Sequence, residues 1–122
     1  MIKTKKQWLY DCIPTGYNIF GEIEPKKELD IFVKNKGKST KKLTINIDCN
    51  TPPIESCKEK ESNILNLGDI SLGIIQYEIP EINAQTEYKL ILLFEKETNI
   101  IYCKLTYSSE DIIEEIKIIK KL

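Results

Sequence analysis

The chain has 122 residues, which is enough for one domain with its own apolar core. Its 18 basic and 19 acidic residues leave a net charge of −1, so we expect neither nucleic acid nor an anionic membrane surface as a partner. All the basic residues are lysines and histidine is absent, which removes the usual planar fork for phosphate contacts and the commonest general base.

The first 16 residues are typical of an arm rather than of a strand. They mix polar and apolar side chains and end near Pro14 and Gly16 without sustained alternation. No long apolar run follows the initial lysines, so the sequence predicts neither a classical signal peptide nor membrane insertion. The aromatic residues near the start form a candidate docking arm that either closes the core of its own chain or adds a strand to another copy. They are Trp8, Tyr10, Tyr17 and Phe20.

Alternation of apolar and polar residues predicts the strands that follow. A first strand is expected at 17–23. Two period-two stretches then flank a turn at 36–40, which predicts a hairpin-like pair, and Pro52 and Pro53 end the second strand. The side chains of this pair that we expect to face the core are Leu29, Ile31, Val33, Leu43, Ile45, Ile47 and Cys49.

The second half continues the pattern after a polar, charged stretch at 54–63, which is predicted to be a surface loop or a short helical turn. Short strands are expected at 64–70, 72–80 and 100–108, and residues 88–94 are apolar on both faces, as in a central strand. The core-facing side chains expected here are Ile75, Tyr77 and Ile79, followed by Ile101, Cys103, Leu105 and Tyr107.

These elements predict an all-β fold, an immunoglobulin-like antiparallel β-sandwich of about 7–8 strands with an N-terminal arm. The arm covers 1–16 and the sandwich 17–109. Residues 110–122 form a C-terminal strand or a short helix, since isoleucines and terminal lysines suit both, and the all-β context favours a strand.

No motif for catalysis or cofactor binding emerges. The carboxylate pairs at Glu22/Glu24, Glu59/Glu61 and Glu114/Glu115 lie beside lysines in polar surroundings, which is typical of a solvated surface. The glycines of 66–73 lack the residues of a phosphate loop. We therefore predict that the protein is not an enzyme and has no catalytic, cofactor-binding or metal site.

The four cysteines carry the most information. Their spacings of 37, 8 and 46 contain no C-x₂-C pair, which argues against zinc. Cys49 and Cys103 lie on core-facing strand positions and are candidates for core residues or a disulfide. Cys12 in the arm and Cys57 in the charged stretch are candidates for an intersubunit disulfide, with an intramolecular bond or a free thiol as alternatives. Three intramolecular pairings are open.

Residues 20–109 resemble the conserved-repeat β-sandwich domain of bacterial and archaeal surface proteins called domain of unknown function eleven. The resemblance rests on a proline turn, a Val-x-Asn-x-Gly turn, and an aspartate followed by a proline stop. In this sequence they are Pro25, Val33, Asn35, Gly37, Asp48, Pro52 and Pro53. It also places a strand at 55–57. Archaeal adhesion-type sandwiches and transglutaminase β-barrel domains resemble the same stretch, and the usual glycine before the long apolar strand is missing.

The resemblance implies structural or adhesive work at a cell or spore surface. We expect a non-enzymatic subunit that self-assembles as a homo-oligomer into a surface filament or appendage, with the arm docked on a neighbour. The alternative is a monomeric adhesin-type protein-binding module. The expected location is extracellular or on a spore surface, where release without a signal peptide and later oxidation would suit cysteine cross-links, and a cytoplasmic location stays open.

Overall fold

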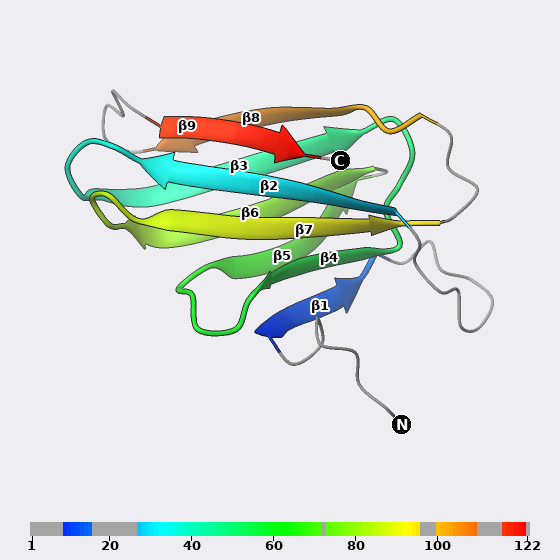
Figure 1. The fold of residues 1–122 in the computed structure, drawn as a ribbon, viewed down its shortest axis with the longest axis horizontal. Helices are drawn as coiled ribbons and strands as arrows, with labels where there is room; N and C mark the ends of the chain where they lie inside the picture. Colours follow the sequence, from blue (N-terminus) through cyan, green and yellow to red (C-terminus); the bar gives the residue numbers. More distant parts are fainter. Residues whose placement is uncertain (1–8, 16–26, 72, 96–99, 110–115, 122) are drawn as a thin grey trace.

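The protein is an all-β sandwich of two antiparallel sheets packed face to face (Figure 1). This computed structural model describes residues 9–15, 27–71, 73–95, 100–109 and 116–121. The predicted immunoglobulin-like fold class is confirmed, with nine strands in the described residues. The strands are β1 (Tyr10–Pro14), β2 (Lys27–Asn35), β3 (Thr40–Cys49), β4 (Glu55–Glu59), β5 (Leu65–Ser71), β6 (Ile74–Ile82), β7 (Glu87–Phe94), β8 (Cys103–Ser109) and β9 (Ile116–Lys121).

The chain passes from one sheet to the other at most of its connections. The first sheet has the order β1-β4-β7-β2-β9 and the second has the order β5-β6-β3-β8. The predicted hairpin of β2 and β3 is therefore wrong, because β2 pairs with β7 and β9 while β3 pairs with β6 and β8. The apolar faces of β2 and β3 meet across the core instead, which buries both faces at once.

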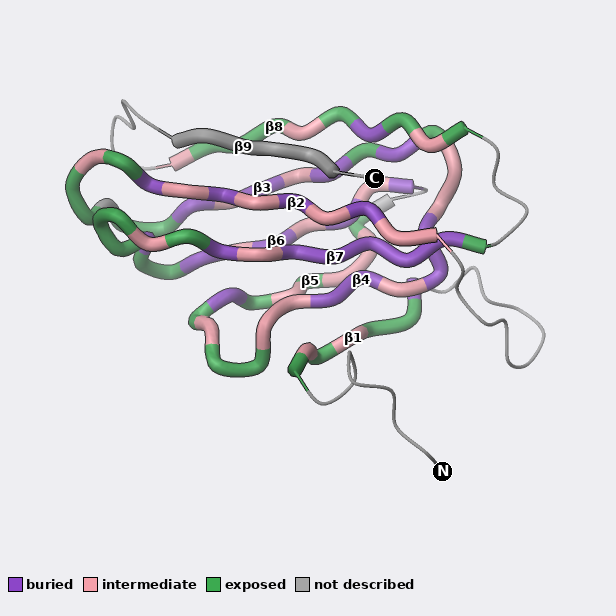
Figure 2. The backbone as a smooth tube through the Cα atoms, viewed as in Figure 1, coloured by how far each residue is buried: buried purple, intermediate pink, exposed green. Residues whose placement is uncertain are grey.

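The core lies between the sheets and follows the alternation of the sequence. On β2, Leu29, Ile31 and Val33 are buried, and the residues between them are half-buried (Figure 2). Each such side chain contributes about 1.5–3 kcal/mol when fully buried. Tyr107 departs from the prediction, because it is 44% exposed on an edge strand. The main core is made of Leu29, Ile31, Val33, Leu43, Ile45, Ile47, Cys49, Ile64, Ile75, Tyr77, Ile79, Ile82, Tyr88, Leu90, Leu92, Phe94 and Cys103.

Strand β7 is the central strand of its sheet, as its sequence predicts. Leu90 and Leu92 point into the main core, whereas Ile91 and Leu93 lie on the opposite face and are also buried. There they form a second apolar cluster with Ile54 and Cys57. This cluster explains why β7 is apolar on both faces.

Asn35 ties two loops together at the end of β2. Its Nδ2 donates to the carbonyl oxygens of Lys38 (2.7 Å) and Ile82 (3.2 Å), and its Oδ1 accepts from the Gly37 N–H (3.0 Å). The Gln85 N–H donates to the Asn35 carbonyl oxygen. A buried asparagine with its hydrogen bonds satisfied explains the Val-x-Asn-x-Gly turn in physical terms.

Two segments differ from the expectations or resolve alternatives. Residues 55–59 form strand β4, so a loop or helical turn there is wrong and the strand implied by the resemblance is present. β4 alternates poorly because both of its faces are covered: Ser56 meets Tyr77 of the other sheet, and Cys57 lies in the second apolar cluster. The tail adopts the strand alternative, since β9 pairs with β2. The first strand expected at 17–23 lies outside the described residues.

Candidate functional site

A disulfide joins the edge strand β1 to its neighbour β4. Cys12 and Cys57 are direct partners in the antiparallel register, with their Cα atoms 4.1 Å apart. The candidate intersubunit bond at these residues is therefore wrong and the intramolecular alternative is the one observed, because both sulfur atoms are bonded to each other within one chain. The register explains the pairing, because opposed residues on adjacent strands bring their Cβ atoms close together.

A second disulfide joins the edge strand β8 to its neighbour β3. Cys49 and Cys103 are register partners, and their Cα atoms are also 4.1 Å apart. Both side chains are buried in the main core. They thus combine the two roles that the sequence left open, core residue and disulfide. We call the Cys12–Cys57 and Cys49–Cys103 bonds the edge disulfides, because each joins an edge strand to the next strand inward.

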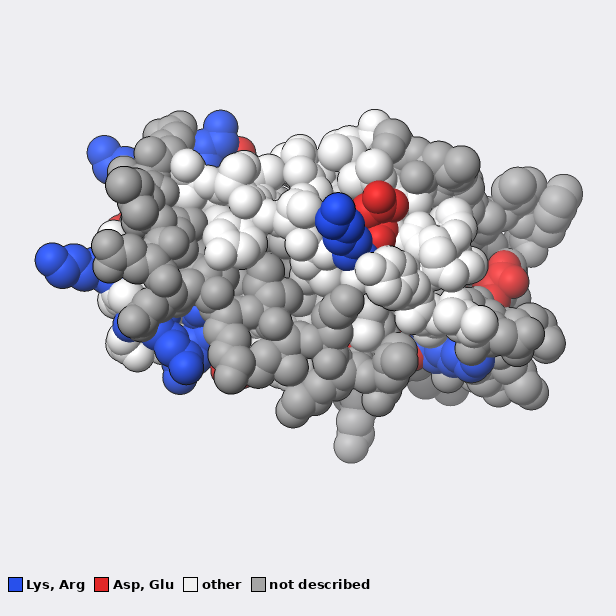
Figure 3. Space-filling view, turned by 90° about the horizontal axis from the view of Figure 1, so that it is seen from above, with Lys and Arg blue, Asp and Glu red and all other residues white. Residues whose placement is uncertain are grey.

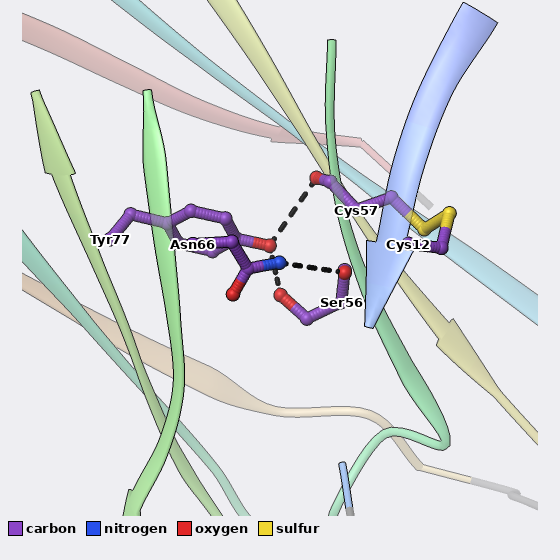
Figure 4. Close-up of a disulfide and its surroundings, with 5 residues drawn as sticks. All are labelled: Cys12, Ser56, Cys57, Asn66 and Tyr77. Carbon is purple, nitrogen blue, oxygen red and sulfur yellow. Dashed lines mark hydrogen bonds between the residues drawn. A yellow bond between two sulfur atoms is a disulfide. The ribbon is translucent and has the colours of Figure 1, made fainter. Parts of the chain in front are cut away.

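A buried hydrogen-bond network lies beside the first edge disulfide and connects the two sheets (Figure 4). The Tyr77 hydroxyl of β6 donates to the Cys57 carbonyl oxygen (3.3 Å) and is hydrogen-bonded to the Ser56 hydroxyl of β4. The Asn66 Nδ2 of β5 donates to the Ser56 carbonyl oxygen at 2.9 Å. Burial raises the pKa of Tyr77, an effect that the hydrogen bond from Ser56 partly opposes. The sequence offered no signal for this network, since Ser56 lies in a stretch predicted to be exposed.

The arm residues that the structure describes pack on their own chain. The Tyr10 ring lies 5.6 Å from the Lys89 Nζ atom, and Tyr10 packs against the second apolar cluster. Thr15 is buried, donating its N–H to the Ile54 carbonyl oxygen (3.1 Å) and its hydroxyl to the Pro53 carbonyl oxygen. Tyr10–Pro14 forms strand β1, so the prediction of an arm without a strand is wrong for these residues, and the alternative in which the arm closes its own fold is the one observed. Trp8, Tyr17 and Phe20 lie outside the described residues.

The first edge disulfide also has a carboxylate beside it. A Glu55 oxygen lies within 4.8 Å of the sulfur atoms of Cys12 and Cys57. Sulfur atoms in a disulfide are not thiolates and do not serve as metal ligands in this state. Burial raises the pKa of Glu55. The arrangement therefore offers no metal centre while the disulfide is intact.

An open hollow of about 370 Å³ lies near the β4–β5 and β6–β7 loops. Its carboxylates belong to exposed or half-buried side chains, and the Glu59 carboxylate already accepts the Lys89 N–H at 2.9 Å. Ligand pockets are usually apolar with a few convergent polar groups, which this hollow is not. Its lining residues are Glu59, Glu61, Ser62, Asn63, Glu81, Asn83, Thr86, Glu87 and Tyr88.

The Asp69 carboxylate on β5 is shielded from solvent without a hydrogen-bond partner among the described residues. Asp69 is the register partner of the buried Ile75, and the shielding applies to both of its oxygen atoms. This burial raises the pKa of Asp69. The carboxylate is thus a local cost to stability at neutral pH.

Comparisons with known proteins found no relative of this chain. No protein-family model, curated protein or solved structure matches the chain. Among the described residues, no helix has the length and apolar character needed to cross a membrane.

Proposed function

We propose that this chain is a non-enzymatic structural subunit of a cell-surface or spore-surface assembly. The observation that carries the proposal is the placement of the edge disulfides. Edge strands are the parts of a sandwich that separate or mispair most readily, and here β1 and β8 are each bonded covalently to the strand next to them. Figure 1 shows these two strands on opposite sides of the molecule.

Disulfides also indicate the compartment in which the protein works. They persist in oxidising surroundings outside the reducing cytosol. Cross-strand bonds at both sides of a sandwich suit a building block that must keep its shape without chaperones or repair. Because all four cysteines are bonded within the chain, assembly in this proposal is non-covalent.

The alternative is a monomeric adhesin-type binding module. It is favoured by one observation, that Tyr10–Pro14 completes the sheet of its own chain rather than extending from it. In that case the edges would serve only the stability of the domain, and the protein would meet its partner as a single copy.

The test begins with the thiols and continues with the association state. Alkylation of the denatured, unreduced protein should label no cysteine, and the protein should run as a 14.2 kDa monomer on a denaturing gel with or without reductant. Native sedimentation velocity and negative-stain electron microscopy should then show association that rises with concentration. A protein that stays monomeric throughout would contradict the subunit proposal and favour the binding module.

A further inference from the structure

The sandwich leaves four edge strands, β1 and β9 in one sheet and β5 and β8 in the other. An edge strand exposes backbone groups that can pair with another strand, and proteins block such edges with short length, proline, bulges or lysines. Three of the four edges carry such a block. β1 has five residues and ends at Pro14. β5 has register shifts at Asn66/Gly68 and Asp69/Ser71, and β9 contains Lys117, Lys120 and Lys121.

β8 lacks these blocks. It has seven residues, contains no proline, and keeps one regular register with β3 from Cys103 to Ser109. Its single lysine, Lys104, is the register partner of Asp48, so an opposite charge already faces it. Figure 3 views the molecule from the side where β8 and β9 lie. Near the middle of this view the described surface is mostly uncharged, and lysine and acidic side chains lie beside each other there.

The ladder geometry shows which backbone groups of β8 point outward. The Asn50 N–H donates to the Tyr102 carbonyl oxygen at 2.9 Å, so the backbone of Tyr102 faces β3. In an antiparallel pair every second residue faces the same neighbour. Lys104 and Thr106 therefore face β3 as well, and the N–H and C=O groups of Leu105 and Tyr107 point away from it.

The other side of β3 agrees with this assignment. The Cys49 N–H donates to the Gly73 carbonyl oxygen at 3.0 Å and so points away from β8. Its register partner Cys103 must then also point its backbone away from β3, in phase with Leu105 and Tyr107. The Tyr107 side chain is 44% exposed and Thr106 is exposed, so a second strand can reach this edge.

We propose that β8 is a self-association edge, on which β8 of a second copy pairs antiparallel about a two-fold axis at Thr106. This register places Leu105 opposite Tyr107 of the second copy, and the N–H and C=O groups of these residues form the new ladder. Lys104 falls opposite Ser108 of the second copy, so no like charges are paired along this ladder. Leu105, which packs against the core, and Tyr107 extend the apolar layer across the junction.

A second copy is the occupant that the described residues favour. Under the two-fold axis the β8 ladder pairs with its own copy without a like-charge pair, and the other described edges of each copy carry blocks, so the strand that best fits β8 of one copy is β8 of another. The inference rests on the proposed function and deepens it by naming a contact. A two-fold contact closes on itself and gives a dimer, so any larger assembly needs a further surface.

The test uses a charge placed on the axis. In sedimentation equilibrium the wild-type protein should show a monomer–dimer equilibrium, and the Leu105 and Tyr107 amides should exchange more slowly at high protein concentration. Thr106→Lys and Thr106→Glu should each weaken dimerisation at least about tenfold, because residue 106 meets its own copy and like charges repel. An equimolar mixture of the two variants should restore it.

Thr44→Lys is the matched control. Thr44 lies on β3 of the same sheet, between its register partners Ser108 and Glu78, and the substitution should leave dimerisation unchanged. The β8 inference would be overturned if neither Thr106 substitution weakened dimerisation, or if mixing the two variants did not restore dimerisation. Either result would leave the proposed function standing. A wild-type protein that stays monomeric up to about millimolar concentration would overturn both, since even weak specific contacts form there.

Discussion

Removing either edge disulfide should cost a large part of the stability of the protein. The bonds close loops with sequence separations of 45 and 54 residues. In the chain-entropy model, each loop restricts the unfolded chain by an amount equivalent to about 4 kcal/mol, and the two values differ by only about 0.2 kcal/mol. We expect Cys12→Ala/Cys57→Ala to lower the free energy of unfolding by up to about 4 kcal/mol.

Cys49→Ala/Cys103→Ala should lower the free energy of unfolding slightly more than the first pair of substitutions does. Both of its side chains are buried in the main core, so the loss of two sulfur atoms adds a packing term of about 1 kcal/mol to the loop term. Cys12 is only half-buried, and this term is smaller for the first pair. Domains of this size have a total free energy of unfolding of about 5–15 kcal/mol, so the loss of both disulfides should leave the fold only marginally stable.

The assay is urea unfolding followed by far-ultraviolet circular dichroism, with each double variant compared with the wild type. The dependence of the free energy on urea should steepen as well, because an unfolded chain without the cross-link exposes more surface. Reduced wild-type protein serves as the control and should be more stable than the variant that lacks all four cysteines by about the packing term, because it keeps the buried sulfur atoms. A loss below about 1 kcal/mol for either pair would refute the loop-closure reasoning.

Three further perturbations test single sites. Tyr77→Phe leaves the buried Ser56 hydroxyl without its partner and should cost about 1–3 kcal/mol in urea unfolding, with Ser56→Ala in a double-mutant cycle showing non-additive losses. Asp69→Asn should stabilise the protein at neutral pH by on the order of 1 kcal/mol, discounted for solvent because the side chain is half-buried. Burial raises the pKa of Asp69 in the folded protein above 3.8. The wild type should therefore lose stability relative to Asp69→Asn as the pH rises from 3.8 through the folded pKa, and equal pH profiles of stability would contradict this account. Gly73→Ala should destabilise the protein by more than about 1 kcal/mol in a thermal melt, because φ is +75° in the β5–β6 turn and the new Cβ would lie 2.9 Å from the Cys49 carbonyl oxygen. Gly37→Ala is the control and should lower the stability less, because its new Cβ would make only a 3.6 Å contact.

The sequence by itself determined which face of most strands turns inward. Leu29, Ile31 and Val33 are buried as their alternation predicts, and β7 is central because it is apolar on both faces. These properties depend on the pleat of a single strand, which reverses its side chains at every residue, and they can be read without knowing any neighbour.

Only the tertiary structure decided which strands are neighbours. Backbone ladder bonds are the same for every residue type, so alternation could not tell that β2 and β3 belong to different sheets. The same limit applies to the cysteines, for which the sequence left three pairings open. Register placed Cys12 opposite Cys57 and Cys49 opposite Cys103, and thereby selected two bonds within one chain. The Ser56–Tyr77 contact was hidden for the same reason, because it joins strands of different sheets.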